Sequence, residues 1–373
     1  MGADFFVVSS RGEVELLEIL RALAANAEIV NSPNVVTRSS GYSAERLAPQ
    51  PEAIALQRVE PDWSFYGREL KEFAFIQTAK SCVFRCAFCE FVVRGGRYEH
   101  LDLSTIERQL DRIADLGTVK SIVFIDDTFN VPAPRFKAIL RMMAEKRYPF
   151  KWSSFFRCDF ADEEALDLLV ATRCEFLKLG LESGSQQILD TMIKGATVSA
   201  YERGIKGLND RGIPFWASFI IGFPGETEKT VEETIAFIER TQPYFYRMSP
   251  WYASRMTSVM KLADKFGIVG DGYNWRHKTM SIEKAIEEAD RAVLSIQNSV
   301  HLPFLVVEDI ISLSHLGIRI DDVKRYCALF NEGVKRRLRN RSDREIPDAL
   351  WGDLLTILSR WDEIGPANRA YVG

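Results

Sequence analysis

The sequence predicts an α/β protein whose main part is a partial (β/α)6 TIM-type barrel, with a small N-terminal βαβ unit and a helical C-terminal lobe. Two observations predict this fold class. From about residue 73, short apolar runs alternate with amphipathic stretches, which is the pattern of repeated βα units on a parallel sheet. From about residue 281, helical patterns follow one another. A chain of 373 residues is long enough for one large barrel with smaller appendages.

The first part of the chain, residues 1–70, is predicted to form one βαβ unit and a linker. Its strands are expected at residues 4–9 and 29–36, and its helix at residues 12–25. A unit of this size is too small to be stable alone. We therefore expect the helix to bury an apolar face against the barrel or against a partner chain. That face consists of Leu16, Leu17, Ile19, Leu20 and Leu23.

The second part, residues 71–252, contains six apolar runs that are predicted to be the barrel strands. They are residues 73–78, 121–125, 152–157, 176–181, 215–223 and 244–252. The stretches with helical spacing between them are residues 103–116, 134–146, 162–171, 199–211 and 227–240. A capping box is expected at the start of the first helix, where Ser104 precedes Glu107. In such sheets, functional groups gather at the carboxyl ends of the strands.

The third part, residues 253–373, is predicted to be a mainly helical lobe. Helical patterns cover residues 281–299, 304–316, 321–338 and 347–361.

Composition excludes several classes of partner. Hydrophobic residues make up 46% of the chain, charged residues make up 27%, and the formal net charge is -4, so no overall positive field would attract nucleic acid or an anionic membrane. No apolar run approaches the roughly 18 residues that cross a bilayer. The first residues have no basic region ahead of an apolar stretch, as a signal peptide would. We therefore expect a cytoplasmic protein.

Three of the six cysteines form a cluster motif. Cys82, Cys86 and Cys89 have the spacing C-x3-C-x2-C directly after the first predicted barrel strand. Such a loop can bring three thiolates to one cubane and leave one iron without a protein ligand, which is open to a substrate. The alternatives are three structural cysteines or a zinc site, although structural zinc ordinarily takes four ligands. The nearest further candidate ligand is His100.

This motif and its place in the strand order resemble the radical S-adenosylmethionine (SAM) superfamily, over about residues 73–252. The resemblance implies a [4Fe-4S] cluster on Cys82, Cys86 and Cys89, and SAM as the molecule that the cluster cleaves reductively. It also implies that Phe88, the aromatic residue before the last cysteine, lies near the adenine. The residues that would position the SAM amino end follow the second strand and are Asp126 and Asp127. A solvated turn or a helix cap is the alternative for these two carboxylates.

Three further strand ends carry candidate SAM contacts. An arginine after the third strand, Arg157, can pair with the SAM carboxylate, or form an ordinary ion pair with Asp159 or Asp162. The fourth strand ends in a segment similar to the family's G-x-E-S-G-S motif, in which Glu182 and Ser183 can bond the ribose hydroxyls or the amino group. After the fifth strand, a turn can let the backbone read the adenine edge, or can be only a tight βα turn. Its residues are Gly222, Pro224 and Gly225.

Within the superfamily, the chain resembles the cobalamin-linked branch, including the phosphinate P-methylases. Residues 2–13 resemble the last strand and helix of a Rossmann-like cobalamin domain, and residues 34–38 and 61–63 resemble its exit and linker. The D-x-H-x-x-G corrin loop of that domain does not occur in this sequence. We therefore expect this chain alone to bind no cobalamin tightly. The gene has shed its cobalamin dependence, or the missing part is supplied in trans, or the reading frame is truncated.

An aromatic group in and after the sixth strand is the candidate substrate pocket. It comprises Tyr244, Tyr246, Trp251, Tyr252, Tyr273 and Trp275, with Arg276 and His277 beside it. The candidate catalytic residues are Tyr252, Trp275 and His277. Ordinary packing between the barrel and the helical lobe explains the same group equally well.

Three functions remain open at this point. The first is an enzyme that makes a 5′-deoxyadenosyl radical and acts on a small-molecule or peptide substrate, such as one in natural-product biosynthesis. It would need an electron donor such as flavodoxin or ferredoxin. The second is a methyltransferase that uses cobalamin supplied in trans. The third is a non-catalytic iron-sulfur or zinc protein, which would leave the segments at Glu182 and Gly222 unexplained.

Overall fold

The computed structural model describes residues 4–7, 12–27, 35–37, 55–58, 60–66, 72–302, 305–340 and 347–364. Its main element is a parallel sheet of seven strands in the order β13-β10-β9-β8-β7-β6-β3. The strands are β3 (Phe73–Ile76), β6 (Ser121–Phe124), β7 (Lys151–Phe156), β8 (Cys174–Glu182), β9 (Phe215–Ile221), β10 (Phe245–Pro250) and β13 (Val300–His301). The partial barrel and its six predicted strands are confirmed, and β13 adds a short seventh strand at the edge.

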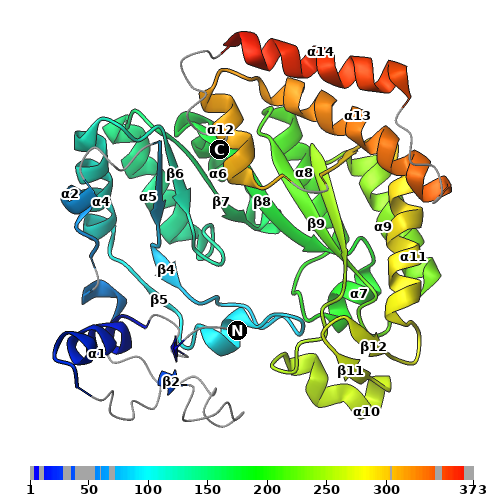
Figure 1. Cartoon of the computed structure of the whole chain (residues 1–373), viewed down its shortest axis with the longest axis horizontal. Coiled ribbons are helices and arrows are strands. Elements are labelled where there is room, and N and C mark those ends of the chain that lie inside the picture. The colour runs from blue at the N-terminus through cyan, green and yellow to red at the C-terminus, as the bar shows by residue number, and fades with distance from the viewer. Residues whose placement is uncertain are drawn as a thin grey trace.

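Amphipathic helices cover the outer face of this sheet (Figure 1). They are α4 (Leu103–Leu116), α5 (Ala133–Lys146), α6 (Glu163–Ala171), α8 (Val198–Asp210), α9 (Glu228–Thr241) and α11 (Ile282–Ser295). Because side chains alternate along a strand, Leu177 and Leu179 of β8 face these helices, while Phe176 faces the opposite side. The predicted boundaries of the barrel helices differ from the observed ones by at most one residue, whereas in the C-terminal part α11 ends four residues early, the next helix begins three residues late and the last helix ends three residues late.

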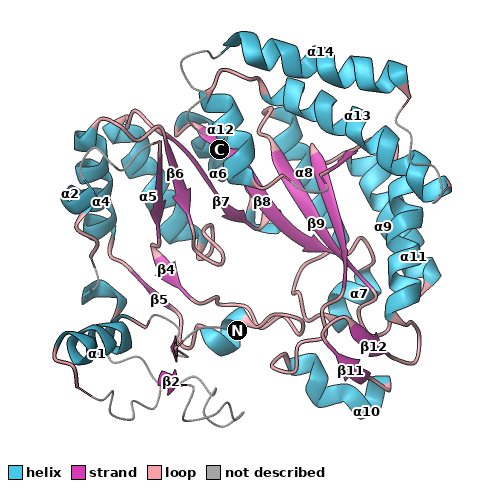
Figure 2. Ribbon diagram, viewed as in Figure 1, coloured by secondary structure: helices cyan, strands magenta, loops and turns pink. Residues whose placement is uncertain are grey.

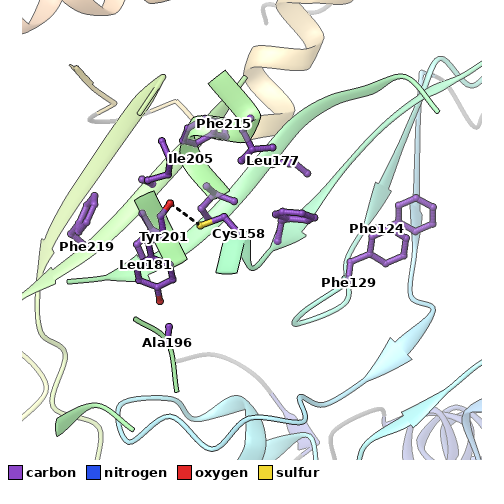
Figure 3. Packing of buried hydrophobic residues seen from close by; sticks show 14 of the residues in the cluster. Phe124, Phe129, Cys158, Leu177, Leu181, Ala196, Tyr201, Ile205, Phe215 and Phe219 are labelled. Atoms are coloured by element: carbon purple, nitrogen blue, oxygen red, sulfur yellow. Dashed lines mark hydrogen bonds between the residues drawn. The ribbon is translucent and has the colours of Figure 1, made fainter. Parts of the chain in front are cut away.

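The core between sheet and helices is tightly packed (Figure 3). Cys158 lies in this core, in the short helix η3 (Cys158–Phe160), and its thiol donates to the carbonyl oxygen of Tyr201 at 4.0 Å. The helix α8 passes so close that a side chain at Gly204 would meet the carbonyl oxygen of Cys158 at 2.2 Å. Cys158 is therefore a packing residue, and it lies apart from the three-cysteine motif.

Two C-terminal helices, α12 (Val307–His315) and α13 (Ile320–Arg339), cover the other face of the sheet at its amino end. The last helix, α14 (Asp348–Ile364), packs on α13. Val307, Ile310 and Ile311 of α12 form a second apolar cluster with Phe176 and with Trp216 of β9. Figure 2 shows this helical layer beside the sheet. The inner face of the barrel is thereby closed at one end, and the carboxyl ends of the strands remain for the site.

Smaller elements surround the carboxyl ends of the strands. They are β4 (Ala79–Lys80), α3 (Phe91–Arg94), β5 (Glu99–His100), α7 (Gln186–Thr191), η4 (Ser258–Leu262), α10 (Ala263–Phe266), β11 (Val269–Asp271) and β12 (Asn274–Arg276). The expectation of a mainly helical lobe from residue 253 is wrong for its first part, where β11 and β12 form an antiparallel hairpin. The expected capping box at Ser104 is also wrong, because α4 begins at Leu103 after Asp102. A capping box occurs instead at Thr227, before α9.

The N-terminal elements differ from a βαβ unit. The strands β1 (Phe5–Val7) and β2 (Val35–Thr37) flank the helix α1 (Glu13–Ala24), but they pair antiparallel, whereas the strands of a βαβ unit are parallel. Residues 29–34 of the second predicted strand lie outside the described residues. The linker contributes η1 (Leu56–Arg58) and α2 (Trp63–Tyr66).

The helix α1 does not bury the apolar face that the sequence predicts. Ile19 is buried, but Leu16, Leu17, Leu20 and Leu23 are about half exposed. The prediction that these four leucines pack on the barrel is therefore wrong. In the part of the chain that the structure describes, no helix is long and apolar enough to span a membrane.

Candidate active site at the carboxyl ends of the strands

The three-cysteine loop lies between β4 and α3, and hydrogen bonds hold it from several sides. At its base, β4 pairs antiparallel with β5. At its centre, the amide of Ala87 donates to the carbonyl oxygen of Met192 at 2.7 Å, and the amide of Val259 donates to the carbonyl oxygen of Ala87 at 3.1 Å. The loop is therefore fixed between two segments that are far apart in the sequence.

The carboxylate of Asp126 anchors the chain where it enters this loop. It accepts hydrogen bonds from the amides of Thr78 and Ala79 at 2.6 and 2.9 Å, and from the hydroxyl of Thr78. Arg135 of α5 binds the same segment from the other side, through the carbonyl and hydroxyl oxygens of Thr78. Burial raises the pKa of Asp126 to about 6, against the lowering effect of these donors. Since Asp126 is buried and its oxygens are engaged, the expectation that it contacts SAM is wrong.

The other carboxylate of this strand end, Asp127, is partly exposed. Burial raises its pKa as well. The next residue, Thr128, has its hydroxyl 3.3 Å from the sulfur of Cys82. Of the two adjacent carboxylates, only Asp127 therefore remains available to a ligand.

The three thiols lie within electrostatic range of one another. Cys86 is buried, and burial raises the pKa of its thiol, while the nearby cations Lys194 and Arg157 act in the opposite direction. Burial likewise raises the pKa of Cys89. No group of three ligand side chains in the described part of the chain converges on a single metal ion. In a cubane, each of the three thiolates would bind a different iron.

A buried ion pair lies next to the cysteine loop. The ammonium of Lys194 is 3.1 Å from the Oε1 atom of Glu182 and 5.5 Å from the centre of the Phe88 ring. Glu182 has a left-handed backbone, with φ of 70°, next to an irregularity in the pairing of β8 with β9. A side chain at Gly180 would lie 2.5 Å from the Glu182 carboxylate, so the glycine leaves room for it. The structure thus brings together Glu182, Phe88 and Cys86, as the sequence predicts, and adds Lys194.

Lys194 is the residue that sequence reasoning missed. It follows α7 within the segment Ile193-Lys194-Gly195, in which Ile193 and Gly195 both have positive φ. A lysine in a turn between two helices is usually a solvated residue. The turn places this one in a buried position beside a carboxylate, which only the fold reveals.

Arg157 forms the ion pair that was the alternative to a SAM contact. Its guanidinium binds the carboxylate of Asp159 through two nitrogens, at 3.1 and 2.6 Å, and lies 3.8 Å from the centre of the Phe84 ring. Both charged side chains are buried. The third nitrogen, Nη1, is buried without a hydrogen-bond partner among the described residues. A buried donor of this kind can still bind a ligand carboxylate.

Ser183 has a structural role. Its hydroxyl is fully buried, lies 3.2 Å from the hydroxyl of Thr234 in α9, and accepts from the amide of Ser185 at 3.1 Å. A side chain at Gly184 would meet Phe237 of α9 at 2.5 Å. These contacts hold the strand end against α9, so the expectation that Ser183 binds the ribose is wrong.

The turn after β9 is also closed to a ligand at Gly222. The Gly222 amide donates to Glu226, and the Gly222 carbonyl oxygen accepts from the Nε2 atom of His277 at 3.0 Å. With φ of 86°, a side chain at Gly222 would lie 2.5 Å from Trp275. The expectation that the backbone of Gly222 binds the adenine edge is therefore wrong. A glycine is needed at this position because Trp275 occupies the space of a side chain. At Gly225 a side chain would meet nothing closer than 3.9 Å. Neighbouring Pro224 completes the turn.

The aromatic group after the sixth strand does not form one pocket. Tyr244 donates to Asp321 of α13, and the buried ring of Tyr246 lies tilted against His301, so both are packing residues at the start of β10. Trp275 and His277 are buried and stack in parallel, 5.2 Å apart, behind Gly222. Only Tyr252 and Tyr273, which pack edge to face, are largely exposed. The single-pocket expectation is therefore wrong, and Tyr252 is the one accessible residue of the three catalytic candidates.

The inner face of the sheet exposes apolar side chains near the same strand ends. Phe75, Ile125 and Phe155 come from or directly follow three neighbouring strands and are 49%, 44% and 43% exposed. Lys178 pairs in register with Phe155, and its ammonium lies 4.3 Å from the centre of that ring. Burial lowers the pKa of Lys178, and Glu308 lies 4.0 Å away. This face offers apolar contact with one cation at its edge.

The carboxyl of Glu226 generates a prediction about pH. Burial raises its pKa to about 8, against the backbone donors of Gly222 and Phe223. The folded protein therefore loses stability as the pH rises from about 4.5 towards 8, because the carboxyl ionises more readily in the unfolded chain. Between these pH values, the free energy of unfolding of Glu226→Gln should rise relative to that of the natural protein by a few kcal/mol. Urea unfolding at pH 5 and pH 8.5 measures the difference.

The exposed Glu287 in α11 is the matched control for this prediction. Glu287→Gln should show no such trend with pH. A stability difference between Glu226→Gln and the natural protein that is the same at both pH values would contradict the burial argument.

Comparison with known proteins identifies the domain around this site. The family model of the radical SAM superfamily matches residues 76–238. The chain is similar to an uncharacterized methyltransferase of Pyrococcus horikoshii, with 25% identity over 63% of this chain and 52% of that protein. It is also similar to the bacteriochlorophyllide d C-12(1)-methyltransferase of Chlorobaculum tepidum, with 27% identity over 60% of this chain and 50% of that protein. The chain thus spans about half the length of the curated relatives it matches.

Two solved structures share the fold. One is the radical SAM methyltransferase TsrM from Kitasatospora setae with cobalamin and a [4Fe-4S] cluster bound, with a TM-score of 0.56 and 20% identity over 71% of this chain and 56% of that chain. The other is the cobalamin-dependent SAM radical enzyme OxsB with aqua-cobalamin bound, with a TM-score of 0.59 and 15% identity over 95% of this chain and 62% of that chain. The part of the chain that holds the three-cysteine loop is therefore a radical SAM domain by its family match, and enzymes of that superfamily use a [4Fe-4S] cluster and SAM.

Proposed function

We propose that this enzyme cleaves SAM reductively at the three-cysteine loop and uses the products to start radical chemistry on a small-molecule or peptide substrate. The observation that carries the proposal is the buried charge beside Cys86. Lys194, Arg157 and Glu182 all act electrostatically on that thiol. When bound, the cluster supplies one electron, which breaks a sulfur–carbon bond of SAM and releases methionine.

The residues around the loop suit the polar end of SAM. Lys194 and the free Nη1 atom of Arg157 are cationic donors for its carboxylate, and Glu182 is an acceptor for its amino group. Phe88 offers a ring face for the adenine, and Asp127 a second carboxylate. Because these charges are already buried in the protein, they need little reorganisation when SAM binds.

The substrate side of the proposal rests on the inner face of the sheet. Phe75, Ile125 and Phe155 present apolar surface close to the strand ends that carry Asp127 and Arg157. An apolar part of the substrate would displace water from these side chains, and Lys178 would attract an acidic group at its edge. Tyr252 is the remaining candidate for a residue that contacts substrate.

A second candidate function is methyl transfer with cobalamin. The observation that favours it is the likeness of the fold to TsrM and OxsB, together with the names of the curated relatives. Among the described N-terminal residues, β1 and β2 pair antiparallel, and these two strands therefore do not form the parallel sheet of a Rossmann-like corrin site. In this second candidate function, cobalamin would be supplied in trans.

The first prediction from this proposal concerns the cluster. Anaerobic reconstitution should give about four irons and four sulfides per chain, since three thiolates hold a cubane. Cys82→Ala, Cys86→Ala or Cys89→Ala should abolish it, as measured by iron and sulfide analysis. Replacing Cys158, Cys174 or Cys327, which lie elsewhere in the fold, should leave the iron content unchanged. A full cluster in Cys86→Ala would sink the assignment.

The second prediction concerns SAM. Glu182→Ala and Lys194→Met should each raise the Kd for SAM about tenfold or more, which corresponds to about 1.4 kcal/mol, because each removes a charged contact. Iron content should stay the same, since neither residue binds iron. Equilibrium dialysis with labelled SAM measures the Kd, and Lys206→Met on the exposed side of α8 is the control. Unchanged affinity in both site variants would refute this placement of SAM.

The third prediction separates the two candidate functions. The intact chain should not retain methylcobalamin or hydroxocobalamin in equilibrium dialysis at micromolar concentrations, because β1, α1 and β2 form too small a surface for a corrin. Dithionite-reduced protein should still convert SAM slowly to 5′-deoxyadenosine. One tightly bound corrin per chain would overturn the first proposal in favour of methyl transfer.

A further inference from the structure

We propose that the surface formed by the cysteine loop and α3 is the docking site for an acidic one-electron carrier protein. This inference rests on the proposed function, which requires that electrons reach the cluster from outside. In the step itself, one electron passes from the reduced carrier to the oxidised cluster. The carrier is oxidised, the cluster is reduced, and no atom or group is transferred.

The first observation is a set of apolar side chains that the fold leaves exposed on this surface. Phe91 is 61% exposed, and Val83 and Val93 are 43% and 40% exposed. All three lie within four residues of a cysteine of the loop. Apolar side chains in so short a stretch cost free energy when they face water, and exposed apolar groups with a polar rim are typical of protein interfaces.

The second observation is the charge around these side chains. Arg85, Arg94 and Arg97 are exposed, and Glu90 is the one acidic residue between Val83 and Arg97. Glu90 is engaged by Arg94 at 2.9 Å. Within the described part of the chain, Arg85 and Arg97 have no ion-pair partner. The chain as a whole has a net charge of -4, but this surface is basic, so it complements an acidic partner.

The neighbouring elements do not cancel this charge. Ser254, which follows β10, donates to Glu90 and so lies at the edge of the surface. The next residue, Arg255, is largely exposed and forms an ion pair with Asp271 of β11. On the other side, Glu99 of β5 is partly buried and accepts from the amide of Leu56. Among the described residues, the charges without an ion-pair partner on this surface are therefore those of Arg85 and Arg97.

The third observation is proximity. Electron transfer slows steeply with distance, so a carrier has to bind where little protein separates it from the cluster. Cys82 and Cys89 are partly exposed, and Arg85 lies between the cysteines in the sequence. The opposite side of the loop is covered by Met192 and Val259 through hydrogen bonds to Ala87. The outer surface of the loop is thus the short route to the cluster.

The test compares two reductants in the same assay, which measures 5′-deoxyadenosine formed from SAM by the reconstituted holoenzyme. One is reduced flavodoxin, an acidic carrier protein. The other is photoreduced 5-deazaflavin, a small molecule that needs no protein surface. The variants are the triple change Arg85→Glu, Arg94→Glu, Arg97→Glu and the neutral change Phe91→Ser. The control triple change, Arg319→Glu, Arg337→Glu, Arg339→Glu, has the same net charge and affects α13 and its N-cap, at the other end of the molecule from β4 and β5 (Figure 1).

The flavodoxin-driven rate should fall tenfold or more in the first triple variant and several-fold in Phe91→Ser. The rate of the natural protein should fall as salt is raised, and the triple variant should lose this dependence. The deazaflavin-driven rate should stay within twofold in all variants. Equal flavodoxin-driven rates in the surface and control variants, or equal losses with both reductants, would overturn the docking site. Failure of deazaflavin to drive SAM cleavage by the natural protein would contradict the proposed function instead.

Discussion

The buried carboxylate of Asp126 is the interaction on which the geometry of the site depends. It binds the backbone of Thr78 and Ala79 where β3 ends, and so sets the direction in which the chain leaves the sheet. The cysteine loop begins two residues later. A carboxylate in a buried position is costly unless donors surround it, and here two amides, a hydroxyl and the nearby Arg135 supply them. The loop is therefore held by the sheet itself, and Met192 and Val259 fix its centre.

Buried charges that are paired with one another also surround Cys86. Lys194 with Glu182, and Arg157 with Asp159, are ion pairs whose side chains are almost fully buried. Buried pairs add little to stability, because the loss of hydration offsets their attraction. Their use here is to hold charge in a fixed position next to the thiols. The Nη1 atom of Arg157 is buried without a hydrogen-bond partner among the described residues.

The sequence correctly predicted the helices and strands that depend on a local pattern of apolar residues. It did not predict the features that depend on contacts between residues far apart in the chain. Periodicity predicted α4 from Leu103 to Leu116 and all six long strands, because each buries a regular face. Periodicity could not give strand direction, so the antiparallel pairing of β1 with β2 was missed. Gly222 looked like a ligand-binding glycine, but Trp275, more than fifty residues later, occupies the space beside it. Asp126 and Asp127 were equivalent in the sequence, and burial of one separates their roles.

The central claim is that the three-cysteine loop holds a cluster with one iron open to SAM. Electron paramagnetic resonance of the dithionite-reduced holoenzyme, recorded with and without SAM, tests it most directly. Without SAM, the spectrum should be that of a reduced [4Fe-4S] cluster with one spin per chain. Addition of SAM should shift the signal, because its amino and carboxylate groups bind the open iron and change the electronic environment of the cluster. A spectrum that is unchanged at saturating SAM would mean that no iron is open, and would contradict this account of the site.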